Sequence, residues 1–192
     1  MQKILSKEQK TKSEKRNKTI LGVAMVALLV LSTAGYAFFS NGEDSESSEK
    51  KTYNGIDFYS LSNSLWGFKV DNLEFYTRYY PGDTENISVP FVSLQNYRGK
   101  NLYFVSEDSQ AKTEIYQNMK YYIDRVQDVC FYDNCTEDLP IKNCSENIVL
   151  ISIGNNTGVE QEENCIFIKA PSSEIIRASD AFIFKVLGIR KI

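Results

Sequence analysis

The chain of 192 residues contains no histidine. This absence excludes Ser-His-Asp and Cys-His catalysis, and it removes the commonest side-chain ligand of catalytic zinc. The four cysteines lack C-x2-C spacing, which disfavours both a zinc site and a redox-active pair. Phosphate-binding glycine loops, the G-x-S-x-G motif and EF-hand spacing are also missing. The sequence therefore predicts no cofactor and no metal site.

A basic surface is lacking as well in the long C-terminal part of the chain. Residues 53–192 carry 13 Lys/Arg against 19 Asp/Glu, a net charge of −6. Phosphate backbones are bound by basic faces, so this balance argues against nucleic acid as a partner. The segment is long enough for one domain with a hydrophobic core.

Charged residues are absent from one further segment, the apolar run Ile20 to Phe39. Twenty helical residues span about 30 Å, the thickness of a hydrocarbon core. The first eighteen residues carry seven Lys/Arg and two Glu, and the positive-inside rule places them in the cytoplasm. We expect a basic cytoplasmic tail (1–18), a transmembrane signal-anchor (19–39), a flexible polar stalk (40–52) and an extracytoplasmic domain (53–192) at the cell membrane.

A cleaved signal peptide is the alternative to a retained anchor. Gly35-Tyr36-Ala37 supplies small residues at positions suited to cleavage. The apolar run is longer than the usual 7–15 residues of a signal peptide, and the basic flank is long, which favours the anchor.

All four cysteines lie on the side predicted to be extracytoplasmic, where disulfides form. Four cysteines permit three pairings. Cys130 with Cys135 closes a small loop and leaves Cys144 for Cys165. The same region holds four N-glycosylation sequons, which begin at Asn86, Asn134, Asn143 and Asn155.

Alternating apolar residues predict a hairpin of strands 66–70 and 73–77 joined at Asp71-Asn72. Further strands are expected at 56–59, 89–92, 102–105, 148–153 and 165–169. Spacings of three and four residues predict a helix from Asp108 or Ser109 to about Asp128, and a second one from Ser172 or Ser173 to Gly188. We therefore expect an α+β fold: a mostly antiparallel sheet covered by two helices, disulfide-bridged, and preceded by a single transmembrane helix.

The second disulfide constrains the topology. In a simple hairpin of strands 148–153 and 165–169, Cys144 and Cys165 would lie roughly 20 Å apart. A disulfide needs Cα atoms closer than about 7 Å. The bridge therefore predicts a short reversing strand near 157–161, between two strands that run in the same direction.

Paired carboxylates are the remaining enzymatic option, because glycoside hydrolases need only two acids at a set distance. The candidate acids are Glu107, Asp108, Glu174 and Asp180. Helix-end positions explain the first three without catalysis. Asp180 and Arg177 are three residues apart and are expected to form an exposed ion pair on a helix. No catalytic residue is therefore assigned.

Tyrosines are frequent outside the anchor and offer a possible contact surface. Exposed tyrosines can stack on sugars or anchor a protein partner. The candidate surface consists of Tyr76, Tyr79, Tyr80, Tyr97 and Tyr103. Cross-strand packing is the structural alternative for these side chains.

The C-terminal segment resembles a family of small, single-pass exported archaeal proteins that end in an Asp-bearing helix. Asn164 to Ile168 and Ile176 to Ile189 carry the resemblance, which extends over residues 85–190; the helix closes with Lys185, two apolar residues, Gly188 and Ile189. The resemblance implies an archaeal cell-surface location and no particular activity.

These features together predict a membrane-anchored extracytoplasmic interaction or structural domain with a protein or glycan partner at the cell surface. A small carbohydrate-active enzyme is one alternative. An accessory subunit of an envelope complex is another, since the small residues Ala24, Ala27 and Gly35 permit close helix contact within the membrane.

Overall fold

The structure, a computed structural model, describes residues 21, 25, 49–61, 63–132, 135 and 138–190. The chain divides into two compact units, Met1–Ser47 and Ser48–Ile192. In the first unit only Leu21 and Met25 are described, and both are helical. The predicted basic tail and nearly all of the predicted anchor lie outside the described residues. Among the residues that are described, no helix has the length and apolar character needed to cross a membrane.

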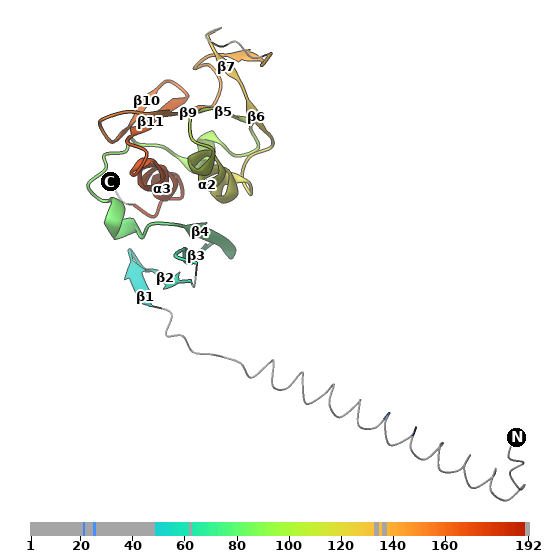
Figure 1. The fold of residues 1–192 in the computed structure, drawn as a ribbon, viewed down its shortest axis with the longest axis vertical. Coiled ribbons are helices and arrows are strands. Elements are labelled where there is room, and N and C mark those ends of the chain that lie inside the picture. Colours follow the sequence, from blue (N-terminus) through green and yellow to red (C-terminus); the bar gives the residue numbers. More distant parts are fainter. Residues whose placement is uncertain are drawn as a thin grey trace, which may run out of the picture. The chain divides into compact units, whose positions relative to one another are not determined.

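The second unit has an α+β fold built in three layers (Figure 1). One outer layer is an antiparallel sheet in the order β1-β2-β3-β4, and the other is a five-stranded sheet in the order β10-β11-β9-β5-β6. Helices α2 (Ser109–Met119) and α3 (Ile175–Val186) lie between the two sheets. The predicted α+β class, with an antiparallel sheet, two helices and two disulfides, is confirmed.

The elements have the following bounds. The antiparallel sheet consists of β1 (Lys50–Tyr53), β2 (Ile56–Ser60), β3 (Trp66–Val70) and β4 (Leu73–Thr77). The five-stranded sheet consists of β5 (Leu102–Ser106), β6 (Val126–Asp128), β9 (Ile148–Ile153), β10 (Gly158–Glu162) and β11 (Cys165–Ala170). Strands β7 (Cys130–Phe131) and β8 (Ile141–Lys142) form a small third sheet, and η1 (Pro81–Thr84) and η2 (Leu94–Asn96) are short 3-10 helices.

The predicted hairpin at Asp71-Asn72 is confirmed. Strands β3 and β4 pair from Trp66↔Thr77 to Val70↔Leu73. Asp71 and Asn72 both have positive φ, 51° and 65°, which matches the twist of a two-residue hairpin turn. Asp and Asn tolerate this left-handed conformation better than most residues.

The topology inferred from the second disulfide is also confirmed. Strands β9 and β11 are parallel, with Cys165 opposite Ile148, and β10 runs back between them in the chain. Cys144 and Cys165 are bridged with their Cα atoms 5.0 Å apart, and Cys130 and Cys135 are bridged with theirs 5.7 Å apart. The five-stranded sheet has two more parallel pairs, β5 with β9 and β5 with β6.

Three predictions about the extent of elements differ from the structure. The first helix ends at Met119 rather than near Asp128, because the chain must turn back for Val126 to pair with Leu102 of β5. Residues 89–92 belong to no strand in the described structure. The predicted stalk overlaps β1, since Lys50 to Tyr53 pair with β2 and the Lys50 ammonium lies 2.7 Å from a carboxylate oxygen of Asp57.

The core lies on both sides of the helical layer. Helix α3 is apolar around most of its circumference, as expected for a helix enclosed between two sheets. Phe184 of this helix packs against Phe58 and Phe68 of the antiparallel sheet. Gly188 has a φ of +72° and ends α3 as predicted, whereas Glu174 rather than Ser172 or Ser173 occupies the N-cap.

Candidate functional site

The five predicted tyrosines do not form one surface. Tyr97 and Tyr103 retain only 3% and 7% of their exposure, so they are core residues and their assignment to a contact surface is wrong. Burial raises the pKa of the Tyr97 hydroxyl. Tyr80 is half-buried against Phe58 and Trp66, and Tyr79 is also half-buried. Only Tyr76 is a largely exposed member of the predicted set.

Tyr76 belongs to a different surface, on the outer face of the antiparallel sheet. Its neighbour across the strands is Gly67, and the next neighbour is Tyr59 of β2. The two tyrosines are 45% and 42% exposed. With Leu61 they flank a shallow groove of about 250 Å³ whose floor is the backbone at Gly67. We call Tyr59, Leu61, Gly67 and Tyr76 the tyrosine groove.

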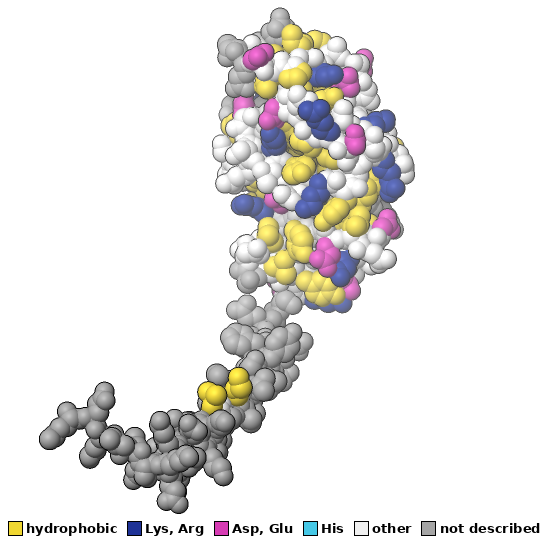
Figure 2. All heavy atoms as spheres, turned by 90° about the vertical axis from the view of Figure 1, so that its right-hand side faces the viewer, with side chains coloured by type: hydrophobic (Ala, Val, Ile, Leu, Met, Phe, Trp, Pro, Cys, Tyr) yellow, Lys and Arg dark blue, Asp and Glu magenta, His cyan; other side chains and the backbone are white. Residues whose placement is uncertain are grey.

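Glycine is what opens this groove. A Cβ atom at position 67 would lie 3.4 Å from both the Tyr76 ring and a methyl of Leu61. At the rim, Lys69 forms an ion pair of 2.9 Å with Glu74, and the Tyr76 hydroxyl donates to the same carboxylate. Figure 2 shows apolar side chains gathered over the antiparallel-sheet end of the unit, with acidic and basic side chains among them. A glycine inside a strand, Gly67, is the sequence feature that could have indicated this site. Tyr59 was not among the tyrosines predicted to form a contact surface.

The free edge of β4 is closed by a side chain from α2. The Asn118 amide accepts a hydrogen bond from the Tyr76 N–H at 3.1 Å and donates one to the Tyr76 carbonyl at 2.8 Å. Asn118 is buried. Its two hydrogen bonds to the Tyr76 backbone replace those that a fifth strand would make at this position. The backbone of Tyr76 is thereby fixed from behind while its ring stays at the surface.

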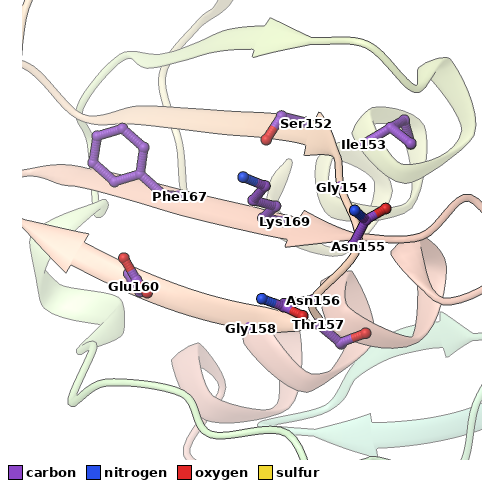
Figure 3. Close-up of a pocket in the computed structure, with 10 residues that line it drawn as sticks. All are labelled: Ser152, Ile153, Gly154, Asn155, Asn156, Thr157, Gly158, Glu160, Phe167 and Lys169. Carbon is purple, nitrogen blue, oxygen red and sulfur yellow. The ribbon is translucent and has the colours of Figure 1, made fainter.

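A second candidate is a hollow of about 830 Å³ on the outer face of the five-stranded sheet (Figure 3). Lys169 of β11 lies at its centre, between Ser152 of β9 and Gly158 of β10 in the same cross-strand row. These small neighbours leave space around the lysine. A Cβ atom at Gly154 would come within 2.3 Å of the Lys169 side chain. The lysine can therefore pack over residue 154 in this position because that residue is glycine.

The hollow combines polar and aromatic groups. Phe167 is partly buried, and it lies opposite Glu160 of the neighbouring strand β10. The turn contributes Asn155, Asn156 and Thr157 to the rim. Among the described residues, Lys169 forms no ion pair with any carboxylate. The arrangement offers a cation, hydroxyl and amide groups, and one aromatic ring to a polar ligand.

The four candidate acids have structural partners. Glu107 accepts a hydrogen bond from the Ile153 N–H at 2.8 Å, and Asp108 caps α2 by accepting from the Ala111 N–H at 2.8 Å. Glu174 forms the ion pair with Arg177. The expected exposed pair of Arg177 with Asp180 is wrong, because the Asp180 side chain is fully buried in the interior.

Asp180, which is fully buried, forms a carboxyl pair with the half-buried Glu114 of α2. The two side chains accept hydrogen bonds from consecutive backbone amides after β4: Arg78 N–H to Glu114 at 3.1 Å and Tyr79 N–H to Asp180 at 2.9 Å. Among the described residues, the second oxygen of Asp180, Oδ1, has no hydrogen-bond partner. Burial, followed by the adjacent Glu114 carboxylate, raises the pKa of Asp180 well above 3.8. Burial also raises the pKa of Glu114. Both shifts favour the protonated form of a carboxyl group.

Three of the four sequons lie within the described residues, and Asn134 lies outside them. Asn86, Asn143 and Asn155 are all exposed. The Asn86 amide oxygen accepts a hydrogen bond from Arg177 at 2.7 Å, and the Asn143 amide oxygen accepts one from the Ser145 N–H at 3.0 Å. Within the described residues, no cluster of three or more His, Cys, Asp or Glu side chains could hold a metal ion.

Comparison with known protein families, characterised proteins and solved structures yields no match to this chain. The resemblance to small exported archaeal proteins therefore stays a prediction.

Proposed function

We propose that this protein is a membrane-tethered extracytoplasmic binding domain. Residues 19–39 hold it in the membrane, residues 1–18 stay in the cytoplasm, and the disulfide-bridged unit binds a partner on the outer side. The charge pattern of the N-terminal region supports this orientation. Two disulfides, one of them between the start of β11 and the segment before β9, support delivery to an oxidising compartment.

The tyrosine groove is the observation that carries the binding role. The inner face of the antiparallel sheet packs on α2 and α3, whereas Tyr59, Leu61 and Tyr76 stay at the surface on the outer face. Tyrosine combines a large apolar ring with a hydroxyl and loses little conformational entropy on binding, which is why it is enriched at interfaces. The glycine floor admits an inserted side chain or sugar ring between the two tyrosines. The partner is therefore a protein or a glycan of the cell surface.

Site-specific photo-crosslinking in native membranes tests the proposal. A benzophenone amino acid replaces Tyr59 or Tyr76, and for the control it replaces Tyr132, which is 60% exposed but lies next to the strand β7. We expect a discrete adduct of higher mass from positions 59 and 76 and none from position 132. The absence of adducts at positions 59 and 76, or the same adducts at all three positions, would contradict a binding role for the groove.

A further inference from the structure

The structure distinguishes the three described sequons by what their asparagine amides already do. The Asn86 amide is bound to Arg177, and the next residue, Ile87, is buried in the core. The Asn143 amide is bound to the Ser145 N–H, and the next residue, Cys144, is in a disulfide. A glycan is attached through the amide nitrogen and leaves these oxygen contacts in place, but in both sequons the central residue is buried.

Asn155 differs from both. Its side chain is exposed in the turn between β9 and β10, and it makes no hydrogen bond within the described residues. Thr157, which completes the sequon, lies in the same turn immediately before β10. Of the three described sequons, this is the one whose central residue, Asn156, is exposed.

The same turn forms the rim of the hollow around Lys169 (Figure 3). An asparagine-linked sugar would begin at this rim, beside a volume of about 830 Å³. The lining suits a sugar: Ser152 and Thr157 offer hydroxyls, Glu160 accepts hydrogen bonds from sugar hydroxyls, and Lys169 donates them. The Phe167 ring offers an apolar surface to the C–H groups of a sugar ring.

Covalent attachment compensates for the openness of the hollow. A ligand linked through a short flexible tether has an effective concentration in the millimolar range. Contacts too weak to hold a free saccharide are then sufficient to hold an attached one. Because Lys169 has small neighbours and no acidic partner among the described residues, its ammonium is available to sugar oxygens.

We propose that Asn155 carries an N-linked glycan whose first sugars lie in the hollow over Ser152, Phe167 and Lys169. This inference rests on the proposed export of the domain, since glycans are added to exported chains. It adds a modification site, and it assigns the open face of the five-stranded sheet to the protein's own glycan. The tyrosine groove, on the other sheet, remains free for a partner.

The first test is site occupancy. The full chain is expressed in a cell that glycosylates exported proteins, and peptides are mapped by mass spectrometry together with the alkylation state of the cysteines. We expect a glycan at Asn155 that is lost in Asn155→Gln and kept in Thr157→Ser. The controls Asn86→Gln and Asn143→Gln should leave the glycan mass unchanged.

The second test is the position of the glycan. We expect nuclear Overhauser effects between a sugar of the glycan and the Phe167 ring. Enzymatic removal of the glycan should lower the melting temperature by about 2–4 °C in the wild type. This difference should disappear in Phe167→Ala. Comparing glycosylated with deglycosylated protein within each variant removes the effect of Phe167 on core packing.

The outcomes separate this inference from the proposed function. Oxidised cysteines with an unmodified Asn155 would overturn the glycan and leave export intact. Free thiols together with no glycan would contradict export itself. A glycan at Asn155 without contacts to Phe167, and with the same thermal shift in Phe167→Ala, would overturn the placement in the hollow.

Discussion

Asp180 and Glu114 show how a single proton completes a buried contact. One carboxyl group is fully buried and the other is half-buried, and ionisation of both is opposed by burial and by mutual repulsion. Each side chain accepts a backbone N–H from the end of β4, and among the described residues the remaining Asp180 oxygen has no hydrogen-bond partner. A proton on Asp180 would remove the repulsion. The groups that face this pair are Arg78, whose backbone and charge lie beside Glu114, and the Tyr79 N–H.

The pair makes stability depend on pH in a defined direction. The pKa of Asp180 is raised in the folded state, so its contribution to stability is fully present below about pH 3.8 and is lost as pH rises through the raised value. Asp180→Asn retains an acceptor for Tyr79 and supplies a permanent donor to Glu114. We expect the free energy of unfolding of this variant, relative to wild type, to increase as the pH rises from 4 through the raised pKa of Asp180 in urea titrations.

The control for this prediction is Asp180→Ala. This change leaves the Tyr79 N–H without its partner and should destabilise the fold by about 1–3 kcal/mol across the pH range. A constant difference between wild type and Asp180→Asn at all pH values would show that Asp180 is not protonated in the native state.

At the scale of elements, the C-terminal half is organised by the pair of parallel strands β9 and β11. The disulfide joins Cys165, at the start of β11, to Cys144, which precedes β9, and β10 returns the chain between the two strands. The other disulfide closes a much shorter loop, with a sequence separation of 5 rather than 21. A longer closed loop restricts the unfolded chain more strongly.

The two disulfides should therefore differ in their contribution to stability. Replacement of Cys144 and Cys165 by alanine should lower the free energy of unfolding by about 3 kcal/mol, and replacement of Cys130 and Cys135 by about 2 kcal/mol. Denaturant unfolding of the two double variants measures the difference. A larger loss from the Cys130–Cys135 variant would contradict the assigned role of the longer loop.

The reversing strand and the hairpin turn could be predicted because each depends on local chemistry or on one distance limit. Asp71-Asn72 encodes its turn, and the Cα separation of a disulfide requires parallel strands. The end of α2 could not be predicted, because the helical spacing of apolar residues continues past Met119. In the structure Val126 instead belongs to β6 and pairs with Leu102 of β5.

The candidate sites were less accessible to sequence reasoning. Exposure of a tyrosine depends on which sheet face it occupies, and nothing local distinguished buried Tyr103 from exposed Tyr76. The Glu114–Asp180 pair joins two helices that are distant in the chain, so only the tertiary fold brings it together. The division into two separate sheets, which places the helices between them, also depends on long-range pairing.

At the scale of the whole molecule, one unit presents two different outer faces. The antiparallel sheet exposes the tyrosine groove, and the five-stranded sheet exposes the hollow around Lys169. The helical layer between them supplies the buried surface that both sheets share. A domain of this kind can bind a partner with one face while the other face is covered by an attached glycan.

The orientation of the chain in the membrane is the central claim, and surface labelling of intact cells tests it most directly. An epitope is fused after Ile192, and cells are treated with an antibody before and after permeabilisation. We predict labelling of intact cells, with the full-length chain in the membrane fraction and its four cysteines resistant to alkylation unless reduced. Labelling only after permeabilisation, with freely alkylated cysteines, would contradict the account.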